Sequence, residues 1–441
     1  MKKANNTQAA LLGLQHLLAM YSGAVAVPLL IGTALGFNTE QMTYLVSIDI
    51  FMCGLATLLQ LMRNRYFGIG LPVVLGCAIQ AVEPLKMIGS QFTIQTMYGA
   101  IIVAGIFVCL VSGQFSKVKR LFPPVVTGTL ITVIGLTLIP IAVQNIGGGN
   151  ASAKDFGSLT NITLGFVTVI LILAIQVFAK GFLSSIAVLL GLVSGSLVAA
   201  ALGLVSLAPL HEAPWFHVPQ PFYFGVPHFE WSSSVTMIII ALVSMVESTG
   251  VYFALGDILN KKITEKDLKL GYRAEGMAVI LGGIFNTFPY TTFSQNVGLL
   301  ELSGIKTKRP IYWSAGLLML LGLLPKAGAL ATMIPTPVLG GAMLVMFAMI
   351  SVQGIRILAS VDFTDQRNIL VVAVSIGLGL GVSIYPNIFQ NLPRTVQLFL
   401  GNGIVVASLS LVLLNLVFKG REGLAKKDIK QQVRVLEDVD K

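Results

Sequence analysis

The stretch FPYTTFSQNVG, residues 288–298, decides the fold of this chain. It places a proline and a run of hydroxyl and amide side chains inside an otherwise apolar sequence. A second stretch, GIGLP at residues 68–72, is interrupted in a similar way. Irregular backbone at membrane depth is tolerated only where it is buried in protein or lines a cavity. The two stretches therefore predict broken membrane helices beside a binding site, although simple proline kinks would give the same pattern.

The composition places both stretches in a membrane protein. Of the 441 residues, 55% are hydrophobic and only 11% are charged, and the mean hydropathy is +0.84. A soluble domain carries about a quarter charged residues. Composition therefore excludes a soluble enzyme, a disordered chain and a nucleic-acid binder, in spite of the net charge of +10. The three cysteines, Cys53, Cys77 and Cys109, show no Cys-x-x-Cys spacing, so neither a disulfide framework nor a zinc site is predicted.

Apolar segments long enough to approach a membrane span recur along the whole chain. A span needs about 20 mainly apolar residues. We expect the N-terminal segment to be a retained span, not a cleaved signal peptide, and the chain to form one polytopic membrane domain. The fourteen candidate segments are residues 9–30, 42–62, 68–85, 96–114, 122–141, 162–179, 183–206, 233–256, 268–287, 288–303, 311–330, 338–358, 368–388 and 395–418.

The basic residues predict the orientation of these segments. Almost all lysines and arginines fall in the N-terminus, the even-numbered loops or the C-terminal tail; the exceptions are Lys86, Lys154, Lys326 and Arg394. Cytoplasmic loops carry an excess of Lys and Arg. We therefore expect an even number of spans, both termini in the cytoplasm, and a location in the cytoplasmic membrane with secondary attraction to anionic lipid.

The two halves of the sequence resemble each other. Seven spans in each half would insert in opposite orientations, and inverted repeats with matching broken helices are typical of secondary transporters. Each match is weak alone, but together they favour a duplication. The matched pairs are residues 124–128 with 337–341, 71–74 with 288–291, and 22–23 with 249–250.

Three polar residues in apolar segments are the first candidates for a site. Glu247 lies in the middle of the eighth segment without a local cation, and intramembrane carboxylates are rare and usually functional. Gln295 and Asn296 need partners in hydrocarbon, either a ligand or another helix. Both readings stay open for these two amides.

Three further ionisable residues are weaker candidates for the site. Glu275 stands two residues after Arg273, so the sequence by itself favours an interfacial ion pair. His16 is either a proton carrier or a hydrogen-bonded packing residue. Asp49 lies within the second segment without a predicted role. No phosphate-binding glycine loop or nucleophilic triad is present, so we expect no cofactor and no ATP coupling, which leaves an ion gradient as the energy source.

At this point the residues show a family resemblance that runs along essentially the whole chain. The chain resembles the nucleobase–cation symporters of the nucleobase–ascorbate transporter type, particularly the bacterial xanthine permeases. The motifs that carry the resemblance are Gln15-His16, residues 247–250, residues 295–298, Ser303 and residues 306–309.

The resemblance implies an all-α polytopic fold of fourteen spans in a seven-plus-seven inverted repeat. It also implies short strands in spans three and ten, elevator-type transport and a homodimer. A core domain would comprise spans 1–4 (residues 1–121) and 8–11 (residues 233–334). A gate domain would comprise spans 5–7 (residues 122–232) and 12–14 (residues 335–418), followed by a cytoplasmic tail (residues 419–441).

The resemblance also implies site residues. In this family the glutamate and glutamine at the positions of Glu247 and Gln295 hydrogen-bond the base. The aromatic position falls on Phe293, and the span-three amide position falls on Gln80. Asn296, Glu275, His16 and the signature glycine Gly298 would organise the site or couple protons. The chain departs from common family residues at Ser303, Glu275, Gln80, Ala81 and Val251.

The chemistry of these side chains fits a purine. Xanthine presents N–H donors beside carbonyl acceptors; a carboxylate accepts hydrogen bonds, while an amide both donates and accepts. We therefore expect a proton-coupled xanthine importer that is not an enzyme. Urate, uracil and hypoxanthine or guanine are the alternative substrates. An anion carrier of the same fold is disfavoured because Glu247 would repel an anion.

Overall fold

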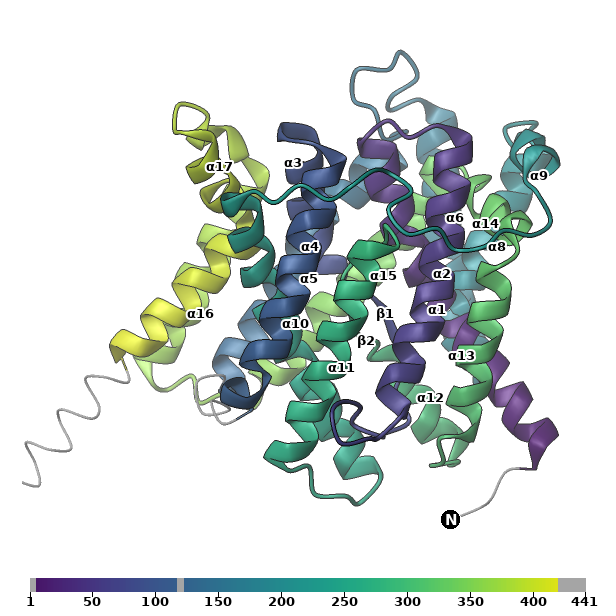
Figure 1. Cartoon of the computed structure of the whole chain (residues 1–441). Helices are drawn as coiled ribbons and strands as arrows, with labels where there is room; N and C mark the ends of the chain where they lie inside the picture. The colour runs from purple at the N-terminus through teal and green to yellow at the C-terminus, as the bar shows by residue number, and fades with distance from the viewer. Residues whose placement is uncertain (1–4, 117–122, 419–441) are drawn as a thin grey trace, which may run out of the picture.

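The computed structural model describes residues 5–116 and 123–418. Figure 1 shows an almost entirely helical molecule with two short strands near its centre. The predicted cytoplasmic tail, residues 419–441, and the basic residues Lys2 and Lys3 lie outside the described residues.

The first half of the chain forms helices on both sides of a short strand. Several helices begin at side-chain caps; Asn5 and Asn38, for example, cap the first two with reciprocal capping boxes. The elements are α1 (Asn6–Ala34), α2 (Thr39–Leu61), β1 (Leu75–Cys77), η1 (Ile79–Ala81), α3 (Val82–Gln91), α4 (Ile94–Phe115), α5 (Pro124–Ile146), α6 (Leu159–Phe178), α7 (Phe182–Ser185), α8 (Ala187–Ala201) and α9 (Ala208–Glu212).

The second half has a similar order of elements. They are α10 (Trp231–Ile258), α11 (Glu265–Ile284), β2 (Tyr290–Thr292), α12 (Gln295–Ser303), α13 (Arg309–Gly322), α14 (Pro325–Thr332), α15 (Thr336–Leu358), α16 (Gln366–Ile384), η3 (Pro386–Phe389) and α17 (Arg394–Leu400). A further apolar helix spans Gly403–Phe418.

The apolar helices confirm a multi-pass membrane protein. Among the described residues, eight helices are long and apolar enough to cross a membrane, or nine if the bent pair α13 and α14 forms one span. The remaining predicted segments are shorter, broken or more charged helices. The expected number of fourteen spans therefore stays a prediction.

The two broken segments meet in the structure. β1 and β2 pair antiparallel, with Leu75 opposite Thr292, Gly76 opposite Thr291 and Cys77 opposite Tyr290. The pairing extends beyond the strands, because the N–H of Ala78 donates to the carbonyl of Pro289 at 2.8 Å. The strands expected in the third and tenth segments are therefore present and lie against each other.

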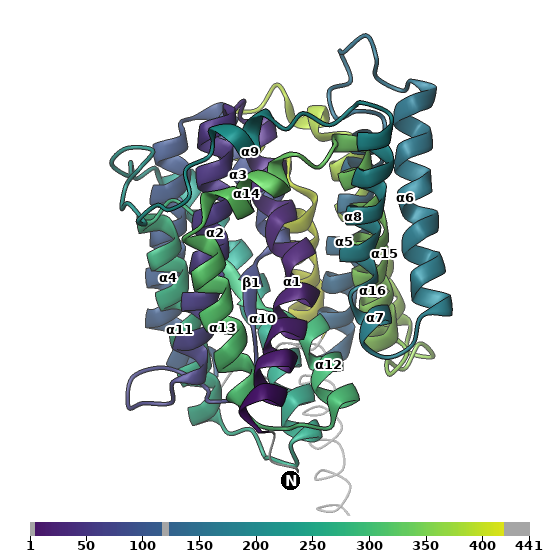
Figure 2. The same cartoon turned by 90° about the vertical axis from the view of Figure 1, so that its right-hand side faces the viewer.

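The helices form two groups that lie side by side in Figure 2. In one group, α4 packs against α11 and α10, while α13 packs against α2 and α1. In the other, α5 packs against α15 and α16, and α6 packs against α15 and α8. The strand β1 lies within the first group, where it packs against α1 and α2 (Figure 2).

Three of the expected apolar segments are each divided into two helices, and their hydropathy does not predict the division. The eleventh expected segment divides into α13 and α14, which are bent by 83° at residues 323–324. The seventh divides into α7 and α8 at Ile186, and the fourteenth divides between α17 and the helix from Gly403. An apolar run reports burial in lipid or protein, but it does not report the direction of the helix axis.

Candidate substrate site

A cavity of about 780 Å³ lies against the strand pair. Five of the predicted site residues line it: Gln80, Glu247, Phe293, Gln295 and Gly298. Gln80 comes from η1, Glu247 from α10, Phe293 from the two-residue link between β2 and α12, and Gln295 and Gly298 from α12 itself. The fold thus brings together side chains from both halves of the sequence.

Glu247 faces this cavity from the middle of α10. Gln80 donates a hydrogen bond from Nε2 to Oε2 of Glu247 at 3.0 Å, and the same Nε2 lies 2.8 Å from Oγ of Ser244. The carboxylate is half-buried, and no lysine or arginine pairs with it in the described part of the chain. Its remaining acceptor sites can accept hydrogen bonds from a ligand in the cavity.

Phe293 occupies a slot between two glycines. Its side chain is 6% exposed and lines the cavity beside β2. A Cβ atom at Gly76 would lie 2.7 Å from Cδ2 of Phe293, and a Cβ at Gly23 would overlap the far end of the ring. Because real Cβ atoms do not approach other atoms so closely, these two glycines fix the position of the ring.

Asn296 and His16 form a buried pair behind the cavity. Nδ2 of Asn296 lies 3.1 Å from Nδ1 of His16 and 3.0 Å from its backbone carbonyl. The two side chains are 3% and 2% exposed. The amide can donate to the ring only if Nδ1 carries no proton, which fixes the tautomer of a neutral imidazole. The pair joins α12 to α1.

Glu275 does not form the interfacial ion pair that the sequence by itself favoured. It is 2% exposed and accepts a hydrogen bond from the hydroxyl of Tyr252, whereas Nε of Arg273 lies 3.3 Å from Oγ of Ser112. Glycines and small residues let α11 approach α4 closely, so Glu275 lies inside the protein instead of at an aqueous interface. It does not line the large cavity, so any influence on a ligand is indirect.

Gly298 lies in α12 and lines the cavity. Small residues in membrane helices often allow a neighbouring backbone to approach closely. In the structure a Cβ atom at this position would meet no atom within 4 Å, because Gly298 faces the cavity. Its contribution is therefore open space in the cavity wall.

Several lining residues were not predicted from the sequence. Gln353 on α15 faces the cavity, and Oγ of Ser294 donates to its Oε1 at 3.3 Å. Glu301 and Arg356 line the same cavity near the C-terminal ends of α12 and α15. A polar residue in an apolar helix could have drawn attention to Gln353, but its partner depends on contacts between the two helix groups.

Lys306 and Lys308, two basic residues of the motif at residues 306–309, bind the ends of other helices. Nζ of Lys306 donates to the carbonyl of Ile258, and Nζ of Lys308 donates to the carbonyl of Leu61 at 3.2 Å. These carbonyls lie at the C-terminal ends of α10 and α2. Helix C-termini leave carbonyl groups unpaired and carry partial negative charge, so lysines stabilise them.

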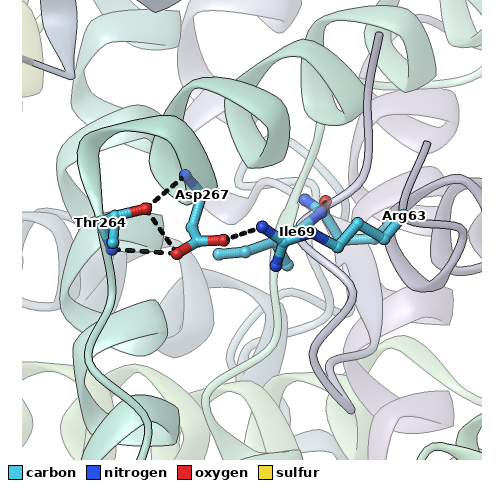
Figure 3. A network of polar contacts seen from close by, with 5 residues as sticks. Arg63, Ile69, Thr264 and Asp267 are labelled. Atoms are coloured by element: carbon cyan, nitrogen blue, oxygen red, sulfur yellow. Dashed lines mark hydrogen bonds and ion pairs between the residues drawn. The ribbon is translucent and has the colours of Figure 1, made fainter. Parts of the chain in front are cut away.

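The loop before β1 is tied to the start of α11 (Figure 3). Arg63 forms an ion pair of 2.6 Å with Asp267, and Asp267 also accepts hydrogen bonds from Thr264 in a capping box. Burial acts to raise the pKa of Asp267, but the bonds from Thr264 and the charge of Arg63 outweigh it and lower the pKa. This cluster therefore holds the loop between α2 and β1 against the first turn of α11.

The sequence of the chain matches a known protein family over most of its length. A model described as the Permease family matches residues 7–388. The chain belongs to this permease family. The resemblance to transporters of the nucleobase–ascorbate type is thereby confirmed for nearly the whole length of the permease.

Individual relatives are similar over almost their full lengths. The uric acid permease PucK of Bacillus subtilis (strain 168) is 53% identical over 423 residues, which cover 96% of this chain and 98% of the relative. The xanthine permease of the same organism is 53% identical over 407 residues, covering 92% and 93%. The uric acid transporter UacT of Escherichia coli (strain K12) is 40% identical over 432 residues, covering 95% and 89%.

Solved structures support the fold of the permease. The transmembrane domain of a cyanobacterial bicarbonate transporter, BicA, is similar with a TM-score of 0.64 at 16% identity, covering 87% of this chain and 97% of that chain. Murine Slc26a9, an anion transporter in the inward-facing state, has a TM-score of 0.60 at 12% identity, covering 95% and 69%. At these identities the similarity concerns the fold alone.

Proposed function

We propose that this permease imports xanthine across the cytoplasmic membrane together with a proton. The observation that carries the proposal is that a carboxylate, two amides and an aromatic ring converge on one cavity: Glu247, Gln80, Gln295 and Phe293. A planar purine with N–H donors and carbonyl acceptors can pair with these groups and stack on the ring. The relatives named xanthine permease and uric acid permease support this substrate class.

Glu247 is the group that we propose to couple the proton and the base. It lies in the middle of a membrane-spanning helix, at the cavity, and without an ion-pair partner in the described residues. A carboxyl group in this position can carry a proton across the membrane when the base is bound. Glu275, Asn296 and His16 lie behind the cavity walls, and we assign them to holding the site in shape.

The helix contacts support a seven-plus-seven repeat. If α1, α2, α4, α5 and α6 correspond to α10, α11, α13, α15 and α16, the most extensive inter-repeat contacts occur in matching pairs. The contact of α2 with α13 corresponds to that of α11 with α4, and α1 with α13 corresponds to α10 with α4. In the same way, α6 with α15 corresponds to α16 with α5.

This symmetry supports the division into two domains. We propose a core domain of residues 1–121 and 233–334, which carries the strands and the site, and a gate domain of residues 122–232 and 335–418. The two groups of helices in Figure 2 support this division. Transport would then proceed by movement of the core against the gate, with the proposed homodimer held by the gate.

The position of the cavity favours an inward-open state. Its lining extends from the strands to Glu301 and Arg356. The C-terminal end of α12, which carries Glu301, lies at the same end of the molecule as the start of α1 (Figures 1 and 2). The distribution of lysine and arginine assigns that end to the cytoplasm.

Urate is the second candidate substrate. The two relatives from Bacillus subtilis with 53% identity are named for urate and for xanthine, so identity does not separate the two bases. An inorganic anion is a poorer candidate, although BicA shares the fold, because it lacks the N–H groups with which a purine can donate to the acceptor oxygens of Glu247 at the cavity.

The proposal is tested by uptake of labelled xanthine into cells that lack their own purine carriers. Unlabelled urate, uracil, hypoxanthine and sulfate are added in turn, with and without a protonophore. The proposal predicts saturable uptake that the protonophore abolishes and that only xanthine or urate inhibits. Absence of xanthine uptake by protein that has reached the membrane would contradict the substrate, and resistance to the protonophore would contradict proton coupling.

A further inference from the structure

The strand pair at the centre of the site is too short to hold itself together. Each strand has three residues, and an isolated pair of strands is marginal at best in water even when the strands are longer. Side chains from the surrounding helices must therefore fix its geometry. Ser248 of α10 does so at one end, with Oγ 3.0 Å from Oγ1 of Thr291 and 3.1 Å from Oγ1 of Thr292.

Asp49 of α2 holds the opposite end of the strand pair. Its Oδ2 accepts from Sγ of Cys77 at 2.8 Å, and its Oδ1 accepts from the hydroxyl of Tyr290 at 2.9 Å. Cys77 and Tyr290 are partners across the β1–β2 ladder. A single carboxylate thus binds one residue of each strand at the same rung, and it is completely buried.

Asp49 is surrounded by hydrogen-bond donors and not by a counter-ion. Neither ion pair found in the described part of the chain involves it. Cys53 approaches the same Oδ2 at 3.9 Å, and the hydroxyl of Tyr290 also lies 2.8 Å from Oγ1 of Thr287. Asp49, Cys53 and Cys77 place their ligand atoms within 4.8 Å of one another, a spacing that a metal ion could bridge. The hydrogen bonds already satisfy this cluster, so we favour a structural reading over a metal site.

We propose that Asp49 is a positioning residue that sets the separation of the two substrate-binding segments. Gln80 follows three residues after Cys77, and Phe293 follows three residues after Tyr290. Of the three residues that hydrogen-bond Asp49, only Cys77 lines the cavity. By fixing the Cys77–Tyr290 rung, it fixes the distance between the amide and the ring that receive the base. The proposal rests on the proposed function, because it concerns the affinity for that substrate.

The test measures KM and Vmax of uptake for whichever base the wild-type protein accumulates. Asp49→Asn keeps the shape of the side chain but can no longer accept hydrogen bonds at both ends. Cys77→Ser keeps a donor, whereas Cys77→Ala and Tyr290→Phe each remove one. Asp155→Asn changes an exposed acidic side chain in a loop and is the matched control.

We expect Asp49→Asn to raise KM by about tenfold, with protein amount and Vmax per molecule close to wild type. Cys77→Ala should raise KM as well, Cys77→Ser should restore it, and Asp49→Asn/Tyr290→Phe should be no worse than Asp49→Asn. A purely structural role would lower the amount of protein and leave KM unchanged, and that result would overturn the proposal. If Asp49→Asn does not reach the membrane, unchanged KM values for Cys77→Ala and Tyr290→Phe overturn it.

Two further measurements distinguish failure of this inference from failure of the proposed function and from the presence of a metal site. If the wild-type protein accumulates no base, the proposed function fails. A cryo-electron microscopy structure of Asp49→Asn then decides the inference, because an undisturbed Cys77–Tyr290 rung would contradict it. Metal analysis of the purified wild-type protein should find far less than one equivalent of zinc. One equivalent that is lost in Cys77→Ala would replace the positioning role with a metal site.

Discussion

Gln80 donates a hydrogen bond of 3.0 Å to the carboxylate of Glu247, although 167 positions separate the two residues in the chain. Gln80 lies in η1, directly after β1, while Glu247 lies in the middle of α10. The contact joins the broken segment of the first half to the membrane carboxylate of the second half. It therefore links the geometry of the strand pair to the group that we propose to bind the base.

Replacement of Gln80 by alanine should weaken substrate binding. The change removes the amide that donates to Glu247 and leaves the carboxylate without this partner, and the loss of such a bond costs about 1–3 kcal/mol. We expect KM for base uptake to rise on the order of tenfold, with normal insertion. Gln176→Ala, at an exposed position of α6, is the control, and a KM equal to that of the control would contradict the role of Gln80.

Replacement of Gly23 by alanine should displace the ring of Phe293. A Cβ atom at Gly23 would overlap that ring, which is held on its other side by Gly76. We expect reduced affinity for the base, because the ring must move into the cavity. Gly23→Ala combined with Phe293→Leu should recover part of the affinity, since the smaller side chain relieves the overlap. Wild-type competition constants for Gly23→Ala would show that the ring position is unimportant.

Asn296 and His16 should behave as one unit in transport assays. The side chain of Asn296 lies 3.1 Å from Nδ1 of His16, and both are buried. In a double-mutant cycle, Asn296→Ala and His16→Ala should therefore be strongly non-additive in KM, because either change already breaks the pair. Additive effects on KM would mean that the two residues act independently.

The broken segments could be predicted from the sequence because their chemistry is local. The prolines and polar residues near 72 and 289 interrupt helices wherever they occur, and Glu247 stands out in any apolar segment. The bend between α13 and α14 was not predicted, although Pro325 at the start of α14 is a recognised helix-start signal. Hydropathy recorded an uninterrupted apolar run there.

The partners of the buried polar groups could not be predicted in this way. Glu275 is close to Arg273 in sequence, but in the fold it meets Tyr252. Asp49 has no sequence neighbour that explains it, and its contacts are Cys77 and Tyr290 on the two strands. Such pairings depend on which helices pack together, and periodicity or spacing within one segment contains no such information.

The Arg63–Asp267 cluster predicts a defined pH dependence of stability. The pKa of Asp267 is lower in the folded protein than the ordinary value of 3.8, so the ionised group stabilises the fold above that value. The contribution is lost only as the pH falls through the lowered pKa. Asp267→Ala should cost about 1 kcal/mol near neutral pH through loss of the capping box.

The measurement is the melting temperature of the detergent-solubilised protein, with Asp155→Ala as the control. The difference between wild type and Asp267→Ala should be constant from about pH 5 to about pH 8 and should shrink only at more acidic pH. A difference that already disappears near neutral pH would contradict this account of the cluster.

The most direct test of the central claim uses purified protein in liposomes with an imposed pH gradient. The wild-type protein should concentrate labelled xanthine or urate only when the gradient is present, with protons entering alongside the base. Glu247→Gln should lose this accumulation, because the amide cannot carry the coupling proton. Accumulation that does not depend on the gradient, or full accumulation by Glu247→Gln, would contradict the assignment of Glu247 as the coupling group.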